Sequence, residues 1–195
     1  MTRKLLICLA LFSLLFIAAG EKTSPAVQRV LTNAINNERA AIARYDAFAV
    51  KAEGEGYIGV ADLFRAEAKA ERVHLARFTA VMNDRGLPLP PDDTKPPSVG
   101  STSANLQTSV SAEFAERDHI YLDAYRAADD AKDSEVATIF DQTRDAETEH
   151  GNLCSAAARN LDAMKEPHAY NVCPVCGYTT DLKLPVCPSC RHAMH

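Results

Sequence analysis

The sequence lacks several features that would assign it to common classes of protein. Its 195 residues contain no tryptophan and no cluster of lysine and arginine, although 21 basic residues are present against 26 acidic ones. Without a basic cluster, and with a net charge of −5, the chain is not expected to bind the backbone of a nucleic acid. Hydrophobic residues make up 47% and charged residues 24%, so the composition is that of a globular protein and excludes general disorder.

The N-terminal apolar run is too short to span a bilayer as a helix, which takes about 20 residues. It covers residues 5–19, which are 15 residues. Arg3 and Lys4 precede the run, and small residues end it at Gly20, in the order that a signal peptidase recognises. Residues 1–20 are therefore predicted to be a cleaved signal peptide, and the protein to be exported, with the periplasm as its expected location. An uncleaved membrane anchor is the alternative.

Helical patterns fill most of the remaining chain. Ser24 and Pro25 read as an N-cap followed by a proline in the first turn. Glycines or prolines interrupt or end the patterns, and Pro167 closes the helical region. The predicted helices cover about residues 25–53, 58–84, 105–131 and 135–164, the last capped by Ser134.

Only the connection between the second and third helices is long. Residues 87–104 contain five prolines, and at about 3.3 Å per residue they can reach about 59 Å. A helix of about 27 residues is about 40 Å long, so this connector can return along the full length of a helix. The pattern predicts an all-α four-helix bundle with one long crossover. An irregular helical bundle is the alternative.

The strongest signal is a repeat of glutamate and histidine residues. The first and third helices each carry a glutamate, and 33 or 34 residues later the second and fourth helices each carry a Glu-x-x-His motif. Because residues three apart share a helix face, both side chains of a motif can reach one site. The repeat consists of Glu38, Glu71, His74, Glu113, Glu147 and His150.

Glu116, one turn after Glu113, adds a fifth carboxylate to the predicted bundle interior. Bare carboxylates in such numbers would be very costly to bury, and two divalent or trivalent cations would remove that cost. Glutamates from two helices and Glu-x-x-His from two others are typical of di-iron and di-manganese bundles. On the first helix the position of Glu116 is occupied by Ala41, so one metal would have an extra carboxylate, an asymmetry that suits catalysis better than storage.

A single Glu-x-x-His is more often a surface pair than a metal site. Glu116 and His119 form a third copy, but His119 lies about 120° around the helix from Glu113 and is predicted to point elsewhere. Tyr45 and Tyr121 lie on the ligand side of their helices and can hydrogen-bond to the carboxylates, although both also fit as ordinary core residues.

The last 25 residues contain two Cys-Pro-x-Cys knuckles separated by ten residues. Such knuckles bring four thiolates around one tetrahedral metal, which spacing alone leaves as zinc or iron. Export raises paired disulfides as an alternative. The cysteines are Cys173, Cys176, Cys187 and Cys190. Cys154, outside the knuckles, is expected to be a small buried thiol.

Together these motifs resemble the rubrerythrin family. The order Glu, Glu-x-x-His, Glu-x-x-Glu, Glu-x-x-His is followed by a Cys-Pro-x-Cys-Gly-Tyr…Cys-Pro-x-Cys tail similar to a rubredoxin, and the match covers about residues 25–195. After the signal peptide predicted at residues 1–20, the resemblance implies a ferritin-like di-iron bundle (21–166) and a rubredoxin-like domain (167–195). It also implies two non-haem irons at Glu38, Glu71, His74, Glu113, Glu116, Glu147 and His150, and iron in preference to zinc at the four knuckle cysteines.

The same resemblance implies an enzyme, a non-haem di-iron peroxidase. Hydrogen peroxide would be reduced to water, and electrons from an unidentified donor protein would pass one at a time through the four-cysteine iron. Tyr45 and Tyr121 match the family pattern and would assist at the site. The family's members are typically homodimers in which the tail of one subunit lies near the di-iron site of the other. The rival readings are a ferritin-like ferroxidase or iron store, an oxygen-reducing protein, and an interaction module with a structural zinc knuckle.

Overall fold

A computed structural model describes residues 23–194, and most of these residues are helical. The predicted signal peptide lies outside the described residues. Within residues 23–194, no helix is both long and apolar enough to cross a membrane. The elements are α1 (Pro25–Gly54), α2 (Ile58–Asp84), α3 (Thr102–Ala115), the π-helix η1 (Glu116–Ile120), α4 (Tyr121–Asp130), α5 (Ser134–Arg159), the 3₁₀ helix η2 (Leu161–Lys165), β1 (Asn171–Val172) and β2 (Thr179–Thr180).

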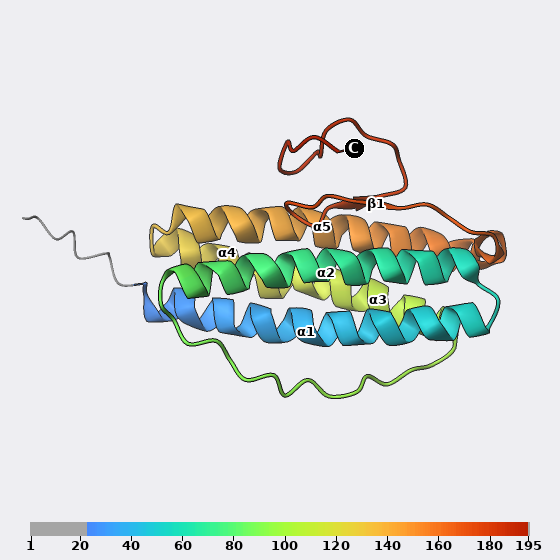
Figure 1. The fold of residues 1–195 in the computed structure, drawn as a ribbon, viewed down its shortest axis with the longest axis horizontal. Helices are drawn as coiled ribbons and strands as arrows, with labels where there is room; N and C mark the ends of the chain where they lie inside the picture. The colour runs from blue at the N-terminus through green and yellow to red at the C-terminus, as the bar shows by residue number, and fades with distance from the viewer. Residues whose placement is uncertain (1–22, 195) are drawn as a thin grey trace, which may run out of the picture.

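The helices form an elongated bundle with one crossover, as predicted (Figure 1). Helices α1 and α2 make one hairpin, and the α3–η1–α4 rod makes the second with α5. The segment between α2 and α3 runs along the outside of α1, where Arg39 Nη1 donates to the carbonyl oxygens of Pro90 and Pro91, each at 3.1 Å. At its far end the side chain of Glu55 accepts from the backbone N–H of Thr102 at 2.8 Å. The prediction of an all-α bundle with a long connector is confirmed.

The structure corrects two helix boundaries. The last long helix is capped by Asp133, not Ser134, because the Asp133 carboxylate accepts from Val136 N at 3.3 Å and also pairs with Arg85. The same helix ends at Arg159 instead of continuing to residue 164. Asn160 leaves the helical region with φ −133°, and its short polar side chain favours such non-helical conformations.

The third predicted helix is also not a single α-helix. It begins at Thr102, capped by Ser101, and the π-helix η1 interrupts it between residues 116 and 120. The spacing between glutamate and tyrosine in the two halves of the sequence agrees with this interruption. Tyr45 follows Glu38 by seven residues, whereas Tyr121 follows Glu113 by eight. The single extra residue is accommodated by the wider turn of the π-helix.

The apolar core is divided into two clusters at opposite ends of the bundle. One contains Leu31, Phe78 and Phe140, and the other contains Phe48 and Phe64. Between them lies a layer of buried glutamates and histidines. Apolar packing is interrupted at this layer. The stability of the middle of the bundle therefore depends on how the charges of the layer are neutralised.

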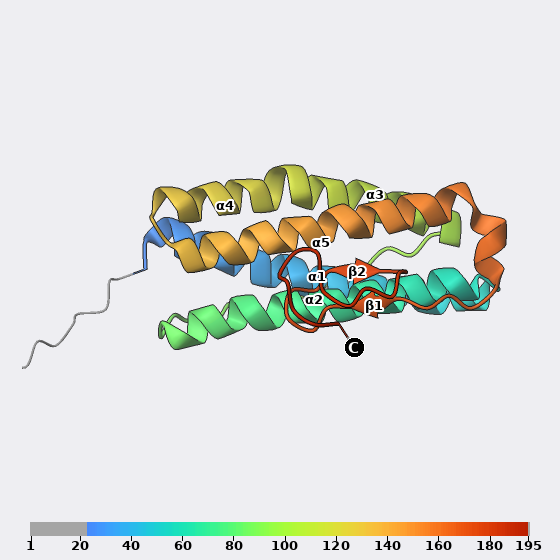
Figure 2. The ribbon, with the colours of Figure 1, turned by 90° about the horizontal axis from the view of Figure 1, so that it is seen from above.

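The C-terminal segment packs against the bundle on the side opposite the long connector (Figure 1). Strands β1 and β2 pair antiparallel, with Asn171 opposite Thr180 and Val172 opposite Thr179. Seen from above, this small ribbon and the cysteine loops lie over α2 and α5 near the middle of the helices (Figure 2). The segment is therefore level with the buried polar layer.

Candidate metal centres

The buried polar layer contains two groups of four potential ligands, in each of which the ligand atoms lie within 4.8 Å of one another. Glu71 and Glu147 belong to both groups, so their carboxylates are placed to bridge two ions. Each group is completed by one further glutamate and one histidine. The first group is Glu38, Glu71, His74 and Glu147, and the second is Glu71, Glu113, Glu147 and His150.

Both histidines direct the same ring nitrogen into the layer. His74 Nδ1 lies 2.8 Å from Glu71 Oε2 and 3.3 Å from Glu147 Oε1. His150 Nδ1 lies 2.9 Å from Glu147 Oε2 and 3.5 Å from Glu113 Oε2. In each case the partner within one helix is the glutamate three residues earlier, which is why the Glu-x-x-His spacing works.

The other ring nitrogen of each histidine contacts the C-terminal segment. His74 Nε2 lies 3.0 Å from the carbonyl oxygen of Cys176, which can only accept a hydrogen bond. His150 Nε2 lies 3.1 Å from Thr179 Oγ1, whose own hydrogen is donated to the carbonyl of Gly177 at 3.1 Å. Both histidines are thus held with a proton on Nε2. This tautomer leaves Nδ1 free to bind a metal.

Two cations would neutralise the carboxylates of this layer better than protons do. Carboxylate oxygens of five glutamates, and Nδ1 of His150, are buried and make no well-aligned hydrogen bond among the described residues, although His150 Nδ1 lies 2.9 Å from Glu147 Oε2. Orphaned carboxylate oxygens are costly in a protein interior, and hard divalent or trivalent ions satisfy them. The five are Glu38, Glu71, Glu113, Glu116 and Glu147.

The pKa values in the layer also indicate that it needs positive charge. Burial, reinforced by the charges of Glu71 and Glu147, raises the pKa of Glu38. Burial also raises the pKa of Glu113, to about 7, although His150 opposes this. Burial would lower the pKa of His74, but Glu147 and Glu71 raise it to about 9. Protons and histidine charge thus take the place that metal charge would occupy.

The two tyrosines cross-link the halves of the bundle through the candidate ligands. Tyr45 on α1 donates its hydroxyl hydrogen to Glu113 on α3, and Tyr121 on α4 donates to Glu38 on α1. Tyr121 in turn accepts from Asn37 Nδ2 at 3.1 Å. Both rings are fully buried. Each hydroxyl therefore fixes the orientation of one carboxylate that belongs to only one of the two ligand groups.

Glu116 lies in the π-helix and is 3% exposed, so the prediction that it points inward agrees with its burial. It belongs to neither group of four; its Oε1 lies 3.7 Å from Nη2 of Arg44, which is also 3.8 Å from Glu113. Its role as a metal ligand stays a prediction. His119 is exposed, as expected for a histidine outside the site.

Sequence reasoning missed Arg44 and Glu67. Arg44 precedes Tyr45 and places a largely buried guanidinium beside the carboxylates of α3 and η1. Glu67 is fully buried one turn before Glu71, and it accepts from the thiol of Cys154 at 3.2 Å. Burial raises the pKa of Glu67 to about 8. The available signal was the four-residue spacing from Glu71, which places Glu67 on the same face of α2.

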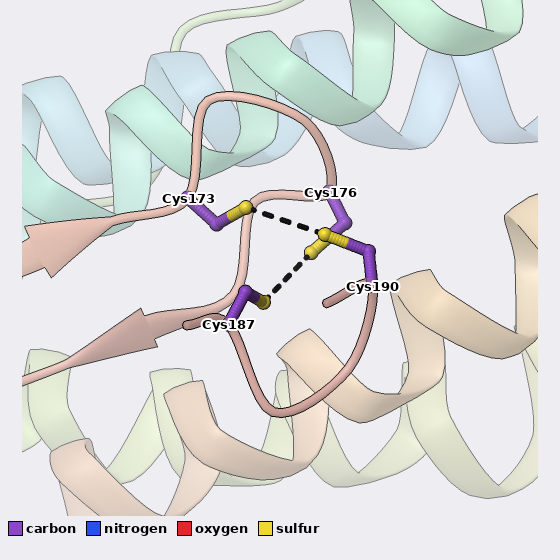
Figure 3. A group of neighbouring side chains, drawn as sticks. All are labelled: Cys173, Cys176, Cys187 and Cys190. Carbon is purple, nitrogen blue, oxygen red and sulfur yellow. Dashed lines mark hydrogen bonds between the residues drawn. The ribbon is translucent and has the colours of Figure 1, made fainter. Parts of the chain in front are cut away.

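The four knuckle cysteines converge in the C-terminal segment (Figure 3). The sulfurs of Cys173 and Cys190 are 3.5 Å apart, as are those of Cys176 and Cys187. A disulfide requires about 2.05 Å, whereas sulfurs bound at about 2.3 Å around a tetrahedral metal are about 3.8 Å apart. All four thiols are free, so the structure contains no disulfide at the knuckles. The cluster fits a single metal ion instead.

Gly177 allows the cysteine loop to approach the bundle. Its φ of +81° suits glycine, and a Cβ at this position would lie 2.3 Å from His74 Nε2. The same glycine donates its backbone N–H to the carbonyl of Cys173 at 3.0 Å. The close approach brings the backbone of a cysteine ligand into direct contact with a histidine of the buried layer.

The rubrerythrin family model matches residues 29–158. The chain belongs to the rubrerythrin family. It is 33% identical to nigerythrin of Nitratidesulfovibrio vulgaris, over 82% of this chain and 79% of that protein. It is 30% identical to a rubrerythrin of Porphyromonas gingivalis, over 89% of this chain and 87% of that protein. Family members are di-iron oxidoreductases, and the residues described above fit two irons in the bundle and a rubredoxin-like metal in the tail.

Solved structures agree with this family assignment. The fully reduced, all-ferrous state of nigerythrin superimposes with a TM-score of 0.79 at 29% identity, covering 91% of this chain and 88% of that chain. A bacterioferritin of Mycobacterium tuberculosis gives a TM-score of 0.67 at 17% identity over 73% of this chain and 90% of that chain. The second likeness concerns the fold alone. The ferritin-like bundle with a cysteine knuckle is thereby confirmed.

Proposed function

We propose that this rubrerythrin-family protein is a peroxidase that reduces hydrogen peroxide to water. The overall reaction consumes one peroxide, two electrons and two protons and releases two water molecules. Two iron ions in the bundle would hold the two electrons that cleave the O–O bond, and a third iron in the tail would accept electrons singly.

The observation that carries the proposal is the contact between His74 Nε2 and the Cys176 carbonyl at 3.0 Å. It joins a ligand residue of the cysteine cluster to a ligand residue of the buried layer through one hydrogen bond within the same chain. An iron store needs no such connection, whereas an enzyme that is re-reduced after each turnover does. The second contact, from His150 to Thr179, supports the same arrangement.

The protein surroundings suit peroxide chemistry. The ligand side chains are fully buried, so bulk water is excluded from the carboxylate layer. Tyr45 and Tyr121 hold the outer carboxylates in place, and Arg44 provides a fixed positive charge beside Glu113 and Glu116. A preorganised cation of this kind stabilises negative charge that develops during the reaction without further rearrangement.

The first test measures iron and zinc per purified chain and follows visible spectra before and after one equivalent of hydrogen peroxide. We expect about three irons per chain, and a thiolate-to-iron absorption that bleaches on reduction and returns with peroxide. Two irons and one zinc would leave the di-iron chemistry but remove the internal electron path. An oxidase or iron-storage function would then be the better description.

The second test is the variant Cys176→Ser. It should abolish re-reduction by an external donor, while a chemically reduced bundle should still consume peroxide. The backbone carbonyl at this position is unchanged, so the variant tests the tail metal separately from the hydrogen bond to His74. Equal loss of both activities would contradict the role of the tail as an electron path.

We also propose that the chain is exported and works as a homodimer with a separate electron-donor protein. The basis is the N-terminal sequence and the family resemblance. In residues 23–194 the tail packs on the bundle of its own chain. Mass spectrometry of the mature N-terminus and light scattering of the purified protein test export and dimer formation.

A further inference from the structure

The cysteine loops of the tail contact the bundle on two neighbouring helices. On α2, His74 Nε2 contacts the carbonyl of Cys176 at 3.0 Å. On α5, Asp145 accepts a hydrogen bond from the hydroxyl of Ser189 at 2.8 Å. Ser189 directly precedes Cys190. The cysteine cluster therefore covers the seam between α2 and α5 (Figures 2 and 3).

Arg77 occupies this seam. It follows His74 by three residues on α2, and Gln142 precedes Asp145 by three residues on α5. Arg77 Nη2 donates to Gln142 Oε1 at 2.5 Å, so the guanidinium bridges α2 and α5 one turn from each of these two contacts. Since residues three apart share a helix face, Arg77 and Gln142 face the same side as the residues that hold the tail.

The charge environment of Arg77 differs from that of a surface arginine. Its Nη1 is buried and has no hydrogen-bond partner within residues 23–194. Burial lowers the pKa of Arg77, and the charges that oppose this effect belong to Cys176, Cys190 and Cys173. The guanidinium lies in the seam that the cysteine loops cover, and the charges of these cysteines favour its protonated form.

A cation in this place acts unequally on the two oxidation states of a four-thiolate iron. Four thiolates around ferric iron carry a net charge of −1, and around ferrous iron −2, because reduction adds one electron and no proton. A fixed positive charge stabilises the more negative, reduced state to a greater degree. Net charge and hydrogen bonding near the sulfurs are known determinants of the potential of iron–sulfur sites.

We propose that Arg77 is a positioning residue for electron transfer, whose fixed charge in the α2–α5 seam raises the reduction potential of the four-cysteine iron. This inference deepens the proposed function, because it rests on iron in the tail. By raising the potential, Arg77 favours acceptance of an electron from the donor. Its placement one turn from His74 lets one stretch of α2 serve both metal centres.

The test is a potentiometric titration of the tail iron in the full-length holoprotein, followed by its thiolate-to-iron absorption. Arg77→Gln removes the charge and keeps a polar group, and Arg77→Lys keeps the charge. Arg72→Gln is the matched control, because Arg72 lies on the same helix, is exposed and pairs with Asp46 at 2.6 Å.

We expect Arg77→Gln to lower the ratio of reduced to oxidised iron about tenfold at a fixed potential, which for one electron is a midpoint lower by about 59 mV. Arg77→Lys should restore most of the difference, and Arg72→Gln should change the ratio less than about twofold, since exposed charges are screened. An unchanged ratio in Arg77→Gln, or an equal fall in Arg72→Gln, would overturn the proposal.

If Arg77→Gln binds no tail iron, Arg77→Met is titrated with the same expectation, because it keeps an unbranched apolar stem in the seam. Loss of tail iron from both neutral variants would assign Arg77 a structural role and overturn the proposal. Failure of the proposed function looks different. Zinc in the tail of the wild-type protein would remove the absorption altogether, whereas failure of this inference leaves the absorption and an unshifted potential.

Discussion

His74 Nε2 donates a hydrogen bond to the carbonyl oxygen of Cys176 at 3.0 Å, and this bond links the two candidate metal centres of the chain. The contact depends on a glycine at position 177, since any Cβ there would overlap the imidazole of His74. A histidine that is held by a carbonyl on Nε2 presents Nδ1 to a metal. The bond therefore serves both the geometry of the carboxylate site and the connection to the tail.

Substitution of Gly177 tests this connection directly. We expect Gly177→Ala to push the tail away from His74, because the new Cβ would lie 2.3 Å from Nε2. Re-reduction of the bundle through the tail should slow by at least about tenfold, since the loss of one positioned hydrogen bond and a shift of about 1 Å have effects of this size. Stopped-flow absorption of the peroxide-oxidised protein, mixed with reductant, measures this rate.

Gly56→Ala is the control for the backbone strain in that experiment. Gly56 has a nearly identical φ of +82°, but a Cβ there meets nothing within 4 Å. Both variants should lose a similar amount of stability from the left-handed backbone, on the order of 1 kcal/mol. If Gly56→Ala slows electron transfer as much as Gly177→Ala, the contact with His74 is not the cause.

The tyrosine hydroxyls are expected to contribute to metal affinity. Tyr45→Phe removes the donor to Glu113, and the carboxylate loses the group that fixes its orientation. Iron affinity of the bundle, measured by competition with a chelator, should fall about 10–100-fold. Tyr125→Phe is a suitable control, because Tyr125 is partly buried against an apolar cluster and has no hydrogen bond to a candidate ligand within residues 23–194. A comparable loss in the control would indicate a packing effect instead.

The sequence was sufficient to predict the bundle because the features that determine its architecture are local or periodic. The bounds of α2 match the prediction of residues 58–84, and the crossover follows from the connector's length and prolines. The convergence of four glutamates and two histidines in one buried layer was predictable from their repeat along the chain. Helix ends were less predictable, since Asp133 and Ser134 are both good N-cap residues and only the structure shows that Asp133 caps the helix and also pairs with Arg85.

Features that depend on contacts between helices escaped sequence reasoning. Nothing in the sequence distinguishes Arg44 from the other arginines. Its role appears only because the fold places Glu113 of α3 and Glu116 of η1 beside it. Glu67 shares a helix face with Glu71, but only α5 supplies the Cys154 thiol that partners it. The π-helix was visible in principle as the eight-residue spacing from Glu113 to Tyr121, against seven in the first half.

Cys154 is expected to be chemically inert in the folded protein. It is fully buried, and burial together with the Glu67 carboxylate raises the pKa of its thiol, so the reactive thiolate is suppressed. Alkylation of Cys154 by iodoacetamide at pH 8, followed by peptide mass spectrometry, should proceed no faster than global unfolding. Labelling that outpaces unfolding, with circular dichroism unchanged, would show that the bundle opens locally beside the ligand layer.

The metal-free protein should lose stability as the pH rises from about 5 to 9. Burial raises the pKa of Glu113 from 4.5 to about 7, and neighbouring glutamates raise that of His74 from 6.5 to about 9 against the effect of burial. In both cases the folded state binds protons more tightly than the unfolded state, so the free energy of unfolding falls with increasing pH through this window.

The size of this pH effect, and its reversal by metal, test whether protons neutralise the carboxylate layer in the metal-free protein. The shift at Glu113 alone corresponds to a loss on the order of 3 kcal/mol between pH 5 and 8. Iron replaces the bound protons, so the loaded protein should show little of this dependence and should be more stable than the metal-free form at pH 8. Urea unfolding at several pH values, with and without iron, measures both. Glu113→Gln should flatten the metal-free profile, and a profile that rises with pH would contradict a proton-filled layer.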